Sequence, residues 1–144
     1  MASHKVNGLI LIVVIMLVQC QSKTPVATQS TASLENTYWK LAEMKGSPLT
    51  TPAGVKEVHI ILSGDLRVKG FAGCNSLGGS YTLSGDQIKF ITITTKMMCP
   101  SSMEVEDFLL NALNSANRYK ITGGVLELYQ DDTRVAKFQS VYLK

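Results

Sequence analysis

The chain has 144 residues, of which 45% are hydrophobic and 17% are charged, a composition typical of a globular protein with room for one domain. The formal net charge is +3, and the Lys and Arg residues are scattered along the sequence rather than clustered. The sequence therefore gives no indication of binding to DNA or RNA, and we expect no nucleic-acid partner.

Residues 1–19 are predicted to be an export signal. Lys5 supplies a positive charge ahead of an unbroken apolar run, LILIVVIMLV, at positions 9–18. A helix that spans a bilayer needs about 20 apolar residues, whereas the apolar segment of a signal peptide is about half as long. A buried core helix is the alternative interpretation of this segment.

The segment LVQC at positions 17–20 resembles the lipobox of bacterial lipoproteins. In that family the cysteine receives a diacylglycerol and becomes the N-terminus after cleavage. We therefore predict lipidation of Cys20 and membrane anchoring through it. Gln19 departs from the pattern, which has a small residue before the cysteine, and a plain secretory signal is the alternative. The residue after the cysteine is Gln21 and not Asp, which resembles the sorting signal of outer-membrane lipoproteins. If the host is Gram-negative, we therefore expect an outer-membrane anchor with the domain facing the periplasm.

Residues 20–33 are rich in Ser, Thr and Gln and contain no large apolar residue. They are predicted to be a flexible, lipidated tether, followed by a folded domain at residues 34–144. The first strand is expected at residues 36–44, which include Tyr38 and Trp39. A loop punctuated by two prolines follows it.

Two β-hairpins are predicted next, because apolar and polar residues alternate on both sides of short Gly-containing turns. In the first, the turn SGD joins two runs whose alternating residues are Val58, Ile60, Leu62, Leu66, Val68 and Gly70. The second hairpin repeats this pattern in SYTLSGDQIKFITIT. Consecutive hairpins of this kind form a β-meander.

A helix is predicted at residues 102–117, where apolar residues recur at helical spacing. They are Val105, Phe108, Leu109, Ala112, Leu113 and Ala116. Ser101 and Glu104 have the spacing of a capping box. Glu104, Glu106 and Asp107 suit the positive end of the helix dipole.

Strands return after the helix, with turns expected at Gly123–Gly124 and Asp131–Asp132. The order is several strands, one helix and several more strands. It predicts an α+β fold, a mainly antiparallel β-meander that forms a strongly twisted sheet or open barrel with one packed helix.

The three cysteines are an uneven count for an exported protein. If Cys20 carries lipid, Cys74 and Cys99 are left as a pair in an oxidising compartment, and we predict a disulfide between them. Closing the loop between them is worth about 3 kcal/mol in the chain-entropy model.

The glycine-rich stretch GFAGCNSLGGSY, residues 70–81, suggests a phosphate-binding loop, a reactive thiol or a structural corner. It lacks the Lys of a phosphate-binding loop and leads into a strand. A catalytic thiol at Cys74 or Cys99 would need a base. The chain after the signal holds one histidine, His59, which we expect to face solvent or lie at a sheet edge. The glycines are therefore expected to allow tight turns and the close approach of neighbouring backbone segments.

No metal site and no cofactor are predicted, because Cys74, Cys99 and His59 do not have the spacing of a zinc site. Met97 and Met98 directly precede Cys99, and Met103 follows it. We expect them to fill the core, and an adaptable contact surface is the alternative.

Several short motifs, in order, resemble the META/HslJ domain family over residues 34–143. The motifs are WKL, GCN, GSY and TKMMCP, followed by an acidic helix, and they carry Trp39, Gly73, Asn75, Gly79, Tyr81, Lys96, Met97 and Pro100. The resemblance implies a β-rich, barrel-like sheet with a helix, similar to secretin pilotin lipoproteins. It also implies a small envelope protein with no established enzymatic activity, in a family linked to heat-shock induction or novobiocin resistance. Residues 76–78 and Lys96 depart from the residues frequent in the family.

We therefore expect a non-enzymatic, monomeric lipoprotein of the cell envelope that supports stress tolerance or envelope integrity through binding. Its expected partners are the membrane, through Cys20, and an envelope protein, a peptide or a small ligand. The main alternative is a pilotin-like carrier that holds a lipid or peptide segment inside a cracked barrel. A third hypothesis is a thiol or redox enzyme centred on Cys74 or Cys99.

Overall fold

The computed structural model describes residues 31–142. The predicted signal, Cys20 and nearly all of the predicted tether lie outside the described residues. The elements are β1 (Tyr38–Met44), β2 (Ser47–Pro48), β3 (His59–Ser63), β4 (Arg67–Phe71), β5 (Ser76–Ser84), β6 (Gln87–Thr94), α1 (Met103–Ser115), β7 (Arg118–Thr122), β8 (Val125–Gln130) and β9 (Thr133–Val141). Among residues 31–142, no helix has the length and apolar character needed to cross a membrane.

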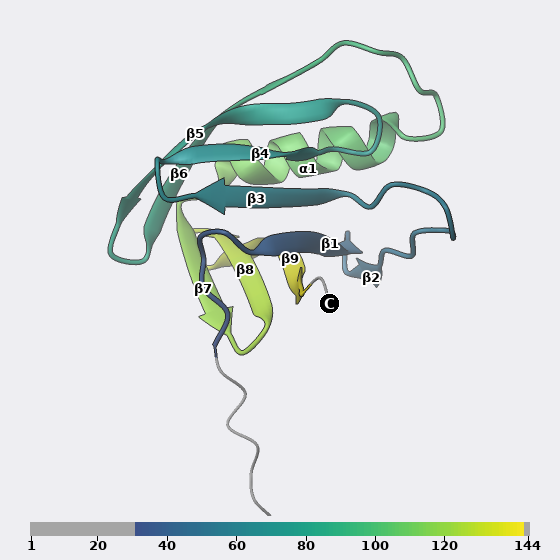
Figure 1. Ribbon diagram of the computed structural model, residues 1–144. Coiled ribbons are helices and arrows are strands. Elements are labelled where there is room, and N and C mark those ends of the chain that lie inside the picture. Colours follow the sequence, from purple (N-terminus) through teal and green to yellow (C-terminus); the bar gives the residue numbers. More distant parts are fainter. Residues whose placement is uncertain (1–30, 143–144) are drawn as a thin grey trace, which may run out of the picture.

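The strands form one antiparallel sheet that returns on itself. Each strand from β3 to β8 pairs with the next one in the chain, and β1 pairs with both β3 and β9. The β6–β7 pairing is the weakest part of this ring, because it is limited to Gln87 and Arg118. The helix α1 packs against β6, β8 and β9 beside this seam. Figure 1 shows α1 behind β3 and β4, on the inner side of the curved sheet.

The interior of the ring is filled with side chains. Trp39, Tyr81 and Phe138 are the largest of the fully buried residues, and Leu109 and Leu113 of the helix pack among them. Alternation along each strand sends every second side chain to this core. The predicted α+β fold, mainly antiparallel with one packed helix, is confirmed.

The helix begins differently from the prediction. Its N-cap is Ser102, whose side chain makes no capping hydrogen bond, so the predicted capping box of Ser101 and Glu104 is wrong. The main-chain N–H groups of Ser102 and Met103 instead donate to the carbonyl of Cys99. This tight turn moves Ser101 off the capping position. Glu104 forms an ion pair with Lys45 of the loop after β1, at 2.7 Å.

The alternation predicted for the first hairpin fails at one residue. Leu66 is 44% exposed and has a φ of 62°. It lies in the turn between β3 and β4, where this left-handed conformation is unusual for a branched side chain. The chain reverses there, so Leu66 does not join the inward-facing row of Ile60, Leu62 and Val68.

Candidate functional site

The outer face of β4, β5 and β6 gathers basic and apolar side chains. Val68 of β4 and Phe90 of β6 point into the core, so their sequence neighbours point outward. Across the sheet, Ile93 pairs with Gly78, which pairs in turn with Lys69. In the same register, Ile91, Ser80 and Arg67 form the next row. We define the basic–apolar face as Arg67, Lys69, Lys89, Ile91, Ile93, Lys96, Met97 and Met98.

The middle strand of this face has small outward side chains. Ser76, Gly78 and Ser80 separate the cations of β4 from the isoleucines of β6. A Cβ added at Gly78 would meet no atom within 4 Å, so the space above it is open. The isoleucines therefore stand above the surface of β5, and Ile91 and Ile93 are each 71% exposed.

The cations of this face form no ion pairs within the described residues, although the charge of Arg67 helps to lower the pKa of the neighbouring Asp65. Within residues 31–142, none of Arg67, Lys69, Lys89 and Lys96 takes part in an ion pair. The carboxylate of Asp65 lies in the turn beside Arg67 and accepts a hydrogen bond from the Ser63 hydroxyl at 2.5 Å. That bond is the main cause that lowers the pKa of Asp65. The face therefore presents positive charge that is not held in ion pairs, beside exposed apolar groups.

The loop that follows β6 is held from below by a disulfide and a buried asparagine. The structure contains the predicted disulfide between Cys74 and Cys99. The Asn75 side-chain oxygen accepts hydrogen bonds from Met97 N at 2.7 Å and from the Thr95 hydroxyl at 2.9 Å. These contacts fix the main chain of the loop, whereas the side chains of Met97 and Met98 remain exposed.

A buried carboxylate completes this support. Glu106 of α1 is 3% exposed and accepts hydrogen bonds from the Asn75 main-chain N–H and side-chain amide, all between 2.9 and 3.1 Å. From the sequence, Glu106 was expected only to suit the helix dipole, and its role beneath the loop was not predicted. Its spacing from Leu109 and Leu113 was the available signal, because residues three and seven apart share one helix face.

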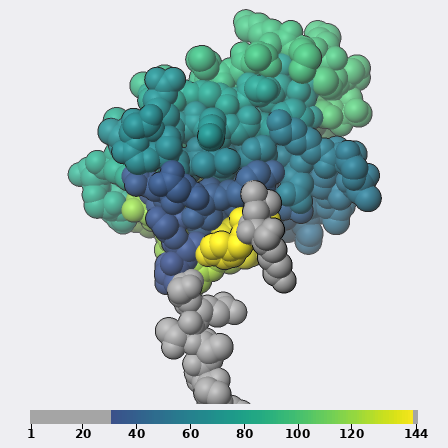
Figure 2. All heavy atoms as spheres, in the orientation of Figure 1, coloured from purple at the N-terminus to yellow at the C-terminus, as the bar shows by residue number. Residues whose placement is uncertain are grey.

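The methionines of the loop are displayed rather than buried. Met98 is 91% exposed and Met97 is 58% exposed, so the prediction that they fill the core is wrong. Figure 2 shows this part of the chain, in green, projecting at one end of the molecule. A flexible, polarizable methionine on a held loop suits an adaptable contact surface.

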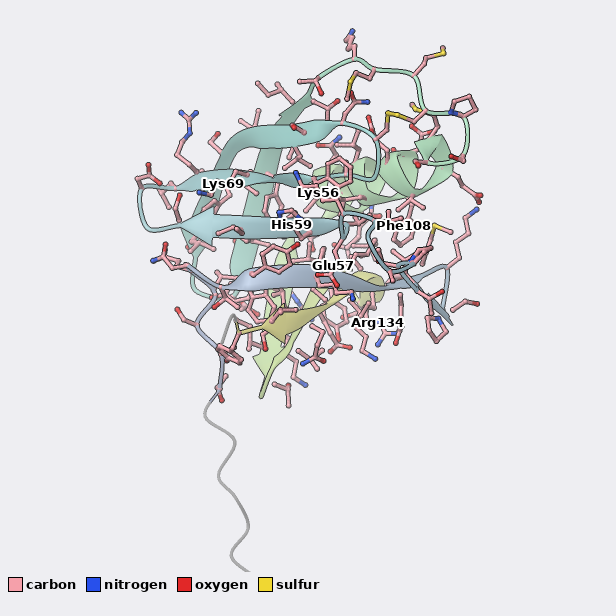
Figure 3. The ribbon with its side chains drawn as sticks, turned by 45° about the vertical axis from the view of Figure 1, so that its right-hand side comes forward. Lys56, Glu57, His59, Lys69, Phe108 and Arg134 are labelled. Atoms are coloured by element: carbon pink, nitrogen blue, oxygen red, sulfur yellow. A yellow bond between two sulfur atoms is a disulfide. The ribbon has the colours of Figure 1, made fainter. Side chains whose placement is uncertain are left out.

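His59 lies on the outer side of β3, but it is buried, so the prediction that it faces solvent or a sheet edge is wrong. It is 9% exposed, because the ring of Tyr38 stacks on it with centroids 4.2 Å apart. Its Nδ1 lies 2.8 Å from the carbonyl oxygen of Glu57. Burial lowers the pKa of His59, and the nearby Lys56 lowers it further, against an opposing effect of Glu57. Figure 3 shows His59 between β1 and β4, beside Lys56.

Several family-motif residues build the core instead of the face. The Trp39 indole donates to the carbonyl of Leu34 at 2.9 Å. The Tyr81 hydroxyl donates to the carbonyl of Ser63 at 2.8 Å, and burial is the main cause that raises the pKa of Tyr81 to about 12. Gly79 has a φ of 150°, and a Cβ there would lie 2.0 Å from the carbonyl oxygen of Ile91. Such close approach excludes any other residue at that position.

The corner glycine and the loop residues are closer to the basic–apolar face. Gly73 has a φ of 117° and packs its backbone against Val105 and Ser102 of the helix start. Lys96 is exposed on the displayed loop, and Pro100 lies where the loop turns toward α1. The lipidation site Cys20 lies outside the described residues.

Two hollows open elsewhere on the surface. One has a volume of about 290 Å³ and lies between the loop before β3 and the start of α1, with Leu49, Val55 and Val105 in its walls. The other consists of two adjoining depressions, of about 230 and 430 Å³, that share Phe108, Arg134 and Val135. Figure 3 shows Phe108 and Arg134 well separated from Lys69.

Neither a free thiol at Cys74 or Cys99 nor a metal-binding group is present in the described part of the chain. Cys74 and Cys99 are bonded to each other and carry no thiol. Residues 31–142 contain no group of three His, Cys, Asp or Glu side chains that could hold a metal ion.

A family model for the META domain matches residues 32–142. The chain belongs to the META domain family. This match covers the whole of the ring-like sheet and α1, and it includes every residue of the basic–apolar face.

Two solved structures are similar to this META-domain chain. One NMR structure has a TM-score of 0.60 at 18% identity, over 75% of this chain and 94% of its own. An NMR structure of a protein from Burkholderia xenovorans has a TM-score of 0.55 at 26% identity, over 75% of this chain and 83% of its own. A search of curated proteins gave no match.

Proposed function

We propose that this META-family protein is a non-enzymatic, lipid-anchored component of the cell envelope that supports stress tolerance or envelope integrity by binding. The observation that carries the proposal is the basic–apolar face. It combines cations that form no ion pairs within the described residues with Ile91, Ile93 and Met98, which are among the most exposed large apolar residues of the described chain. Apolar side chains exposed together in this way mark surfaces that contact a partner.

The support beneath the loop favours the same conclusion. A disulfide and the buried Asn75–Glu106 pair hold the main chain of residues that themselves fill no core position. Ordering a loop costs conformational entropy. Holding Met97 and Met98 in place beforehand lowers the entropy lost when a partner binds them.

The envelope address rests on the first twenty residues. Lys5, the apolar run at 9–18 and the lipobox-like LVQC support export and lipidation at Cys20. The test is the intact mass of protein purified from the membrane of an exporting bacterium. A chain that begins at Cys20 and carries acyl groups is expected, and a chain that retains Met1 would contradict the anchor.

The binding role is tested by photocrosslinking in cells. A photoreactive amino acid is placed at Ile93, on the basic–apolar face, or at Lys120, an exposed position on β7. We expect adducts from position 93 and few or none from position 120. Equal yields from both positions would contradict a binding surface on β4–β6.

A pilotin-like carrier is the second candidate, and the depression beside α1 favours it. Phe108 and Val135 give this depression apolar walls, and the ion pairs of Glu43 with Arg134 and Lys137 lie at its rim. The ring interior is filled by core side chains, so a carried segment would lie in this external depression. This role predicts co-purifying lipid, or a rise in melting temperature with an apolar peptide that Phe108→Asp abolishes. Clean protein with no response would contradict it.

A further inference from the structure

We infer that the basic–apolar face docks on a lipid bilayer that contains anionic headgroups. This inference rests on the proposed binding function and names its partner. The surface is built from two neighbouring stripes, cationic on β4 and apolar on β6, separated only by the small outward residues of β5. The stripes lie about 10 Å apart, because each strand spacing is about 4.8 Å.

Charge complementarity selects an anionic partner. Arg67, Lys69, Lys89 and Lys96 have no ion-pair partner within residues 31–142. Lysine and arginine side chains can lay their apolar stems along a hydrocarbon surface while their charged ends reach lipid phosphates. Each such residue near an anionic leaflet strengthens binding about fivefold.

The apolar part of the face favours a bilayer over a purely polar anion. Ile91 and Ile93 are each 71% exposed, and Met98 at 91% is the most exposed large apolar side chain of the described residues. Ile91 and Ile93 lie on the outer side of β6, and Met98 lies in the loop that continues from the end of this strand. An apolar stripe flanked by Lys and Arg is the arrangement that holds peripheral elements in a membrane interface.

The face also lacks features that a specific small ligand would require. Neither of the two hollows described above includes Lys69, Ile91 or Ile93, and a further depression of about 280 Å³ at the β5–β6 turn takes only Lys89 from the face. Gly78 and the serines beside it leave the centre of the face open. A broad, open surface suits an extended partner such as a lipid leaflet.

The test uses the full chain reconstituted in two kinds of vesicle, phosphatidylcholine alone or phosphatidylcholine mixed with phosphatidylglycerol. Dilute hydrogen peroxide converts accessible methionine to its sulfoxide, and mass spectrometry follows Met98 with Met44 as the internal reference. We expect Met98 to be protected in the anionic vesicles and not in the neutral ones. High salt should remove the protection, because it screens exposed charges.

Matched charge reversals complete the test. Lys69→Glu with Lys89→Glu should abolish the protection of Met98. Arg118→Glu with Lys120→Glu makes the same change in net charge on β7 and should leave the protection intact. A melting temperature for each variant verifies that it is folded.

Equal oxidation of Met98 in both vesicles, or protection that survives the Lys69 and Lys89 reversals, would overturn the inference. If position 93 still crosslinks to a protein in cells under those results, the proposed binding function stands and the partner is a protein. If neither experiment detects contact at this face, the proposed function fails as well.

Discussion

Two faces of the ring-like sheet differ in whether their charged side chains form ion pairs. On the β8–β9 side, Arg134 bridges Glu43 at 2.8 Å and Glu127 at 2.7 Å, and Lys137 contacts Glu43 at 2.5 Å. On the β4–β6 side, within the described residues, the cations have no such partners, and isoleucines stand beside them. Charges in the first face are satisfied within the fold, and those in the second are available to something else.

The ion-paired residues of the β8–β9 side stabilise the fold, whereas the cations and isoleucines of the β4–β6 side are exposed without such contacts in the described residues. Both faces cover the same core and use the same strand alternation. The folded state therefore gains no ion pairs from the exposed groups of β4 and β6. Their exposure together on one surface supports the proposed contact with a partner.

The largest expected effect comes from removing the support of the displayed loop. Asn75→Ala should lower the free energy of unfolding by about 3 kcal/mol, because it removes hydrogen bonds to the buried carboxylate of Glu106. Urea denaturation measures the change. Asn114→Ala is the matched control, since Asn114 is exposed and accepts one bond from Thr92, and it should change stability by less than about 0.5 kcal/mol. Equal losses in the two variants would show that the loop is not held through Asn75.

The disulfide should contribute a comparable amount. Cys74→Ser with Cys99→Ser is expected to lower the free energy of unfolding by about 3 kcal/mol, because the unfolded chain gains loop entropy. It should also raise the oxidation rate of Met97, since the loop loses an anchor. A variant as stable as the parent would mean that Asn75 alone fixes the corner.

The two charged faces should respond differently to neutralisation. Glu43→Gln leaves Arg134 and Lys137 without their shared carboxylate and should lower the melting temperature. Lys69→Gln should leave it unchanged, because no ion pair is lost. The effect of Glu43→Gln should shrink in high salt, where exposed ion pairs are screened. If Lys69→Gln destabilised the protein as much, the contrast between the faces would be wrong.

Acid should weaken the Glu43 network in a defined direction. The hydrogen bond and charge of Lys137 lower the pKa of Glu43 below its ordinary value of 4.5. The folded state therefore binds a proton less readily than the unfolded state, and stability falls as pH drops through and below that value. In Glu43→Gln this part of the acid dependence should be reduced, as urea titrations at several pH values would show. If the free energy of unfolding of Glu43→Gln depended on pH as it does in the parent protein, Glu43 would not cause the loss of stability in acid.

The smallest expected effect is at His59. Burial lowers its pKa below the ordinary value of 6.5, so the unfolded state takes up a proton at a higher pH than the folded state. Stability is therefore fully present above 6.5 and is lost as pH falls toward the lower folded pKa. His59→Gln should flatten the part of this slope that lies just below pH 6.5, above the range in which carboxylates ordinarily titrate. If the pH dependence of stability persists in His59→Gln, another titrating group causes it.

The architecture could be predicted because its signals are local. Alternation with a period of two marked β3 to β6, and helical spacing marked α1. Leu66 and Ser101 were misplaced, because turn geometry depends on how the chain reverses and not on the period. His59 was placed on the correct side of β3, but its cover is Tyr38 of another strand, which no local pattern reveals.

The candidate site was partly visible in the sequence. Phe90 points inward while Ile91 and Ile93 point outward, so β6 is apolar on both sides, and this excess was a signal that we did not use. The scattered Arg and Lys residues gave no signal, because the fold and not the sequence brings Arg67, Lys69 and Lys89 to one face. The methionines were misassigned because only their main chain is held.

Lysine footprinting tests the central claim most directly, since it compares the two sides within one molecule. The protein is acetylated in purified form and in its native envelope, and the modification of each lysine is read by mass spectrometry. We predict that Lys69, Lys89 and Lys96 become protected in the envelope, while Lys120 reacts equally in both states. Protection of Lys120 with unchanged reactivity at the other three would contradict a binding surface on β4–β6.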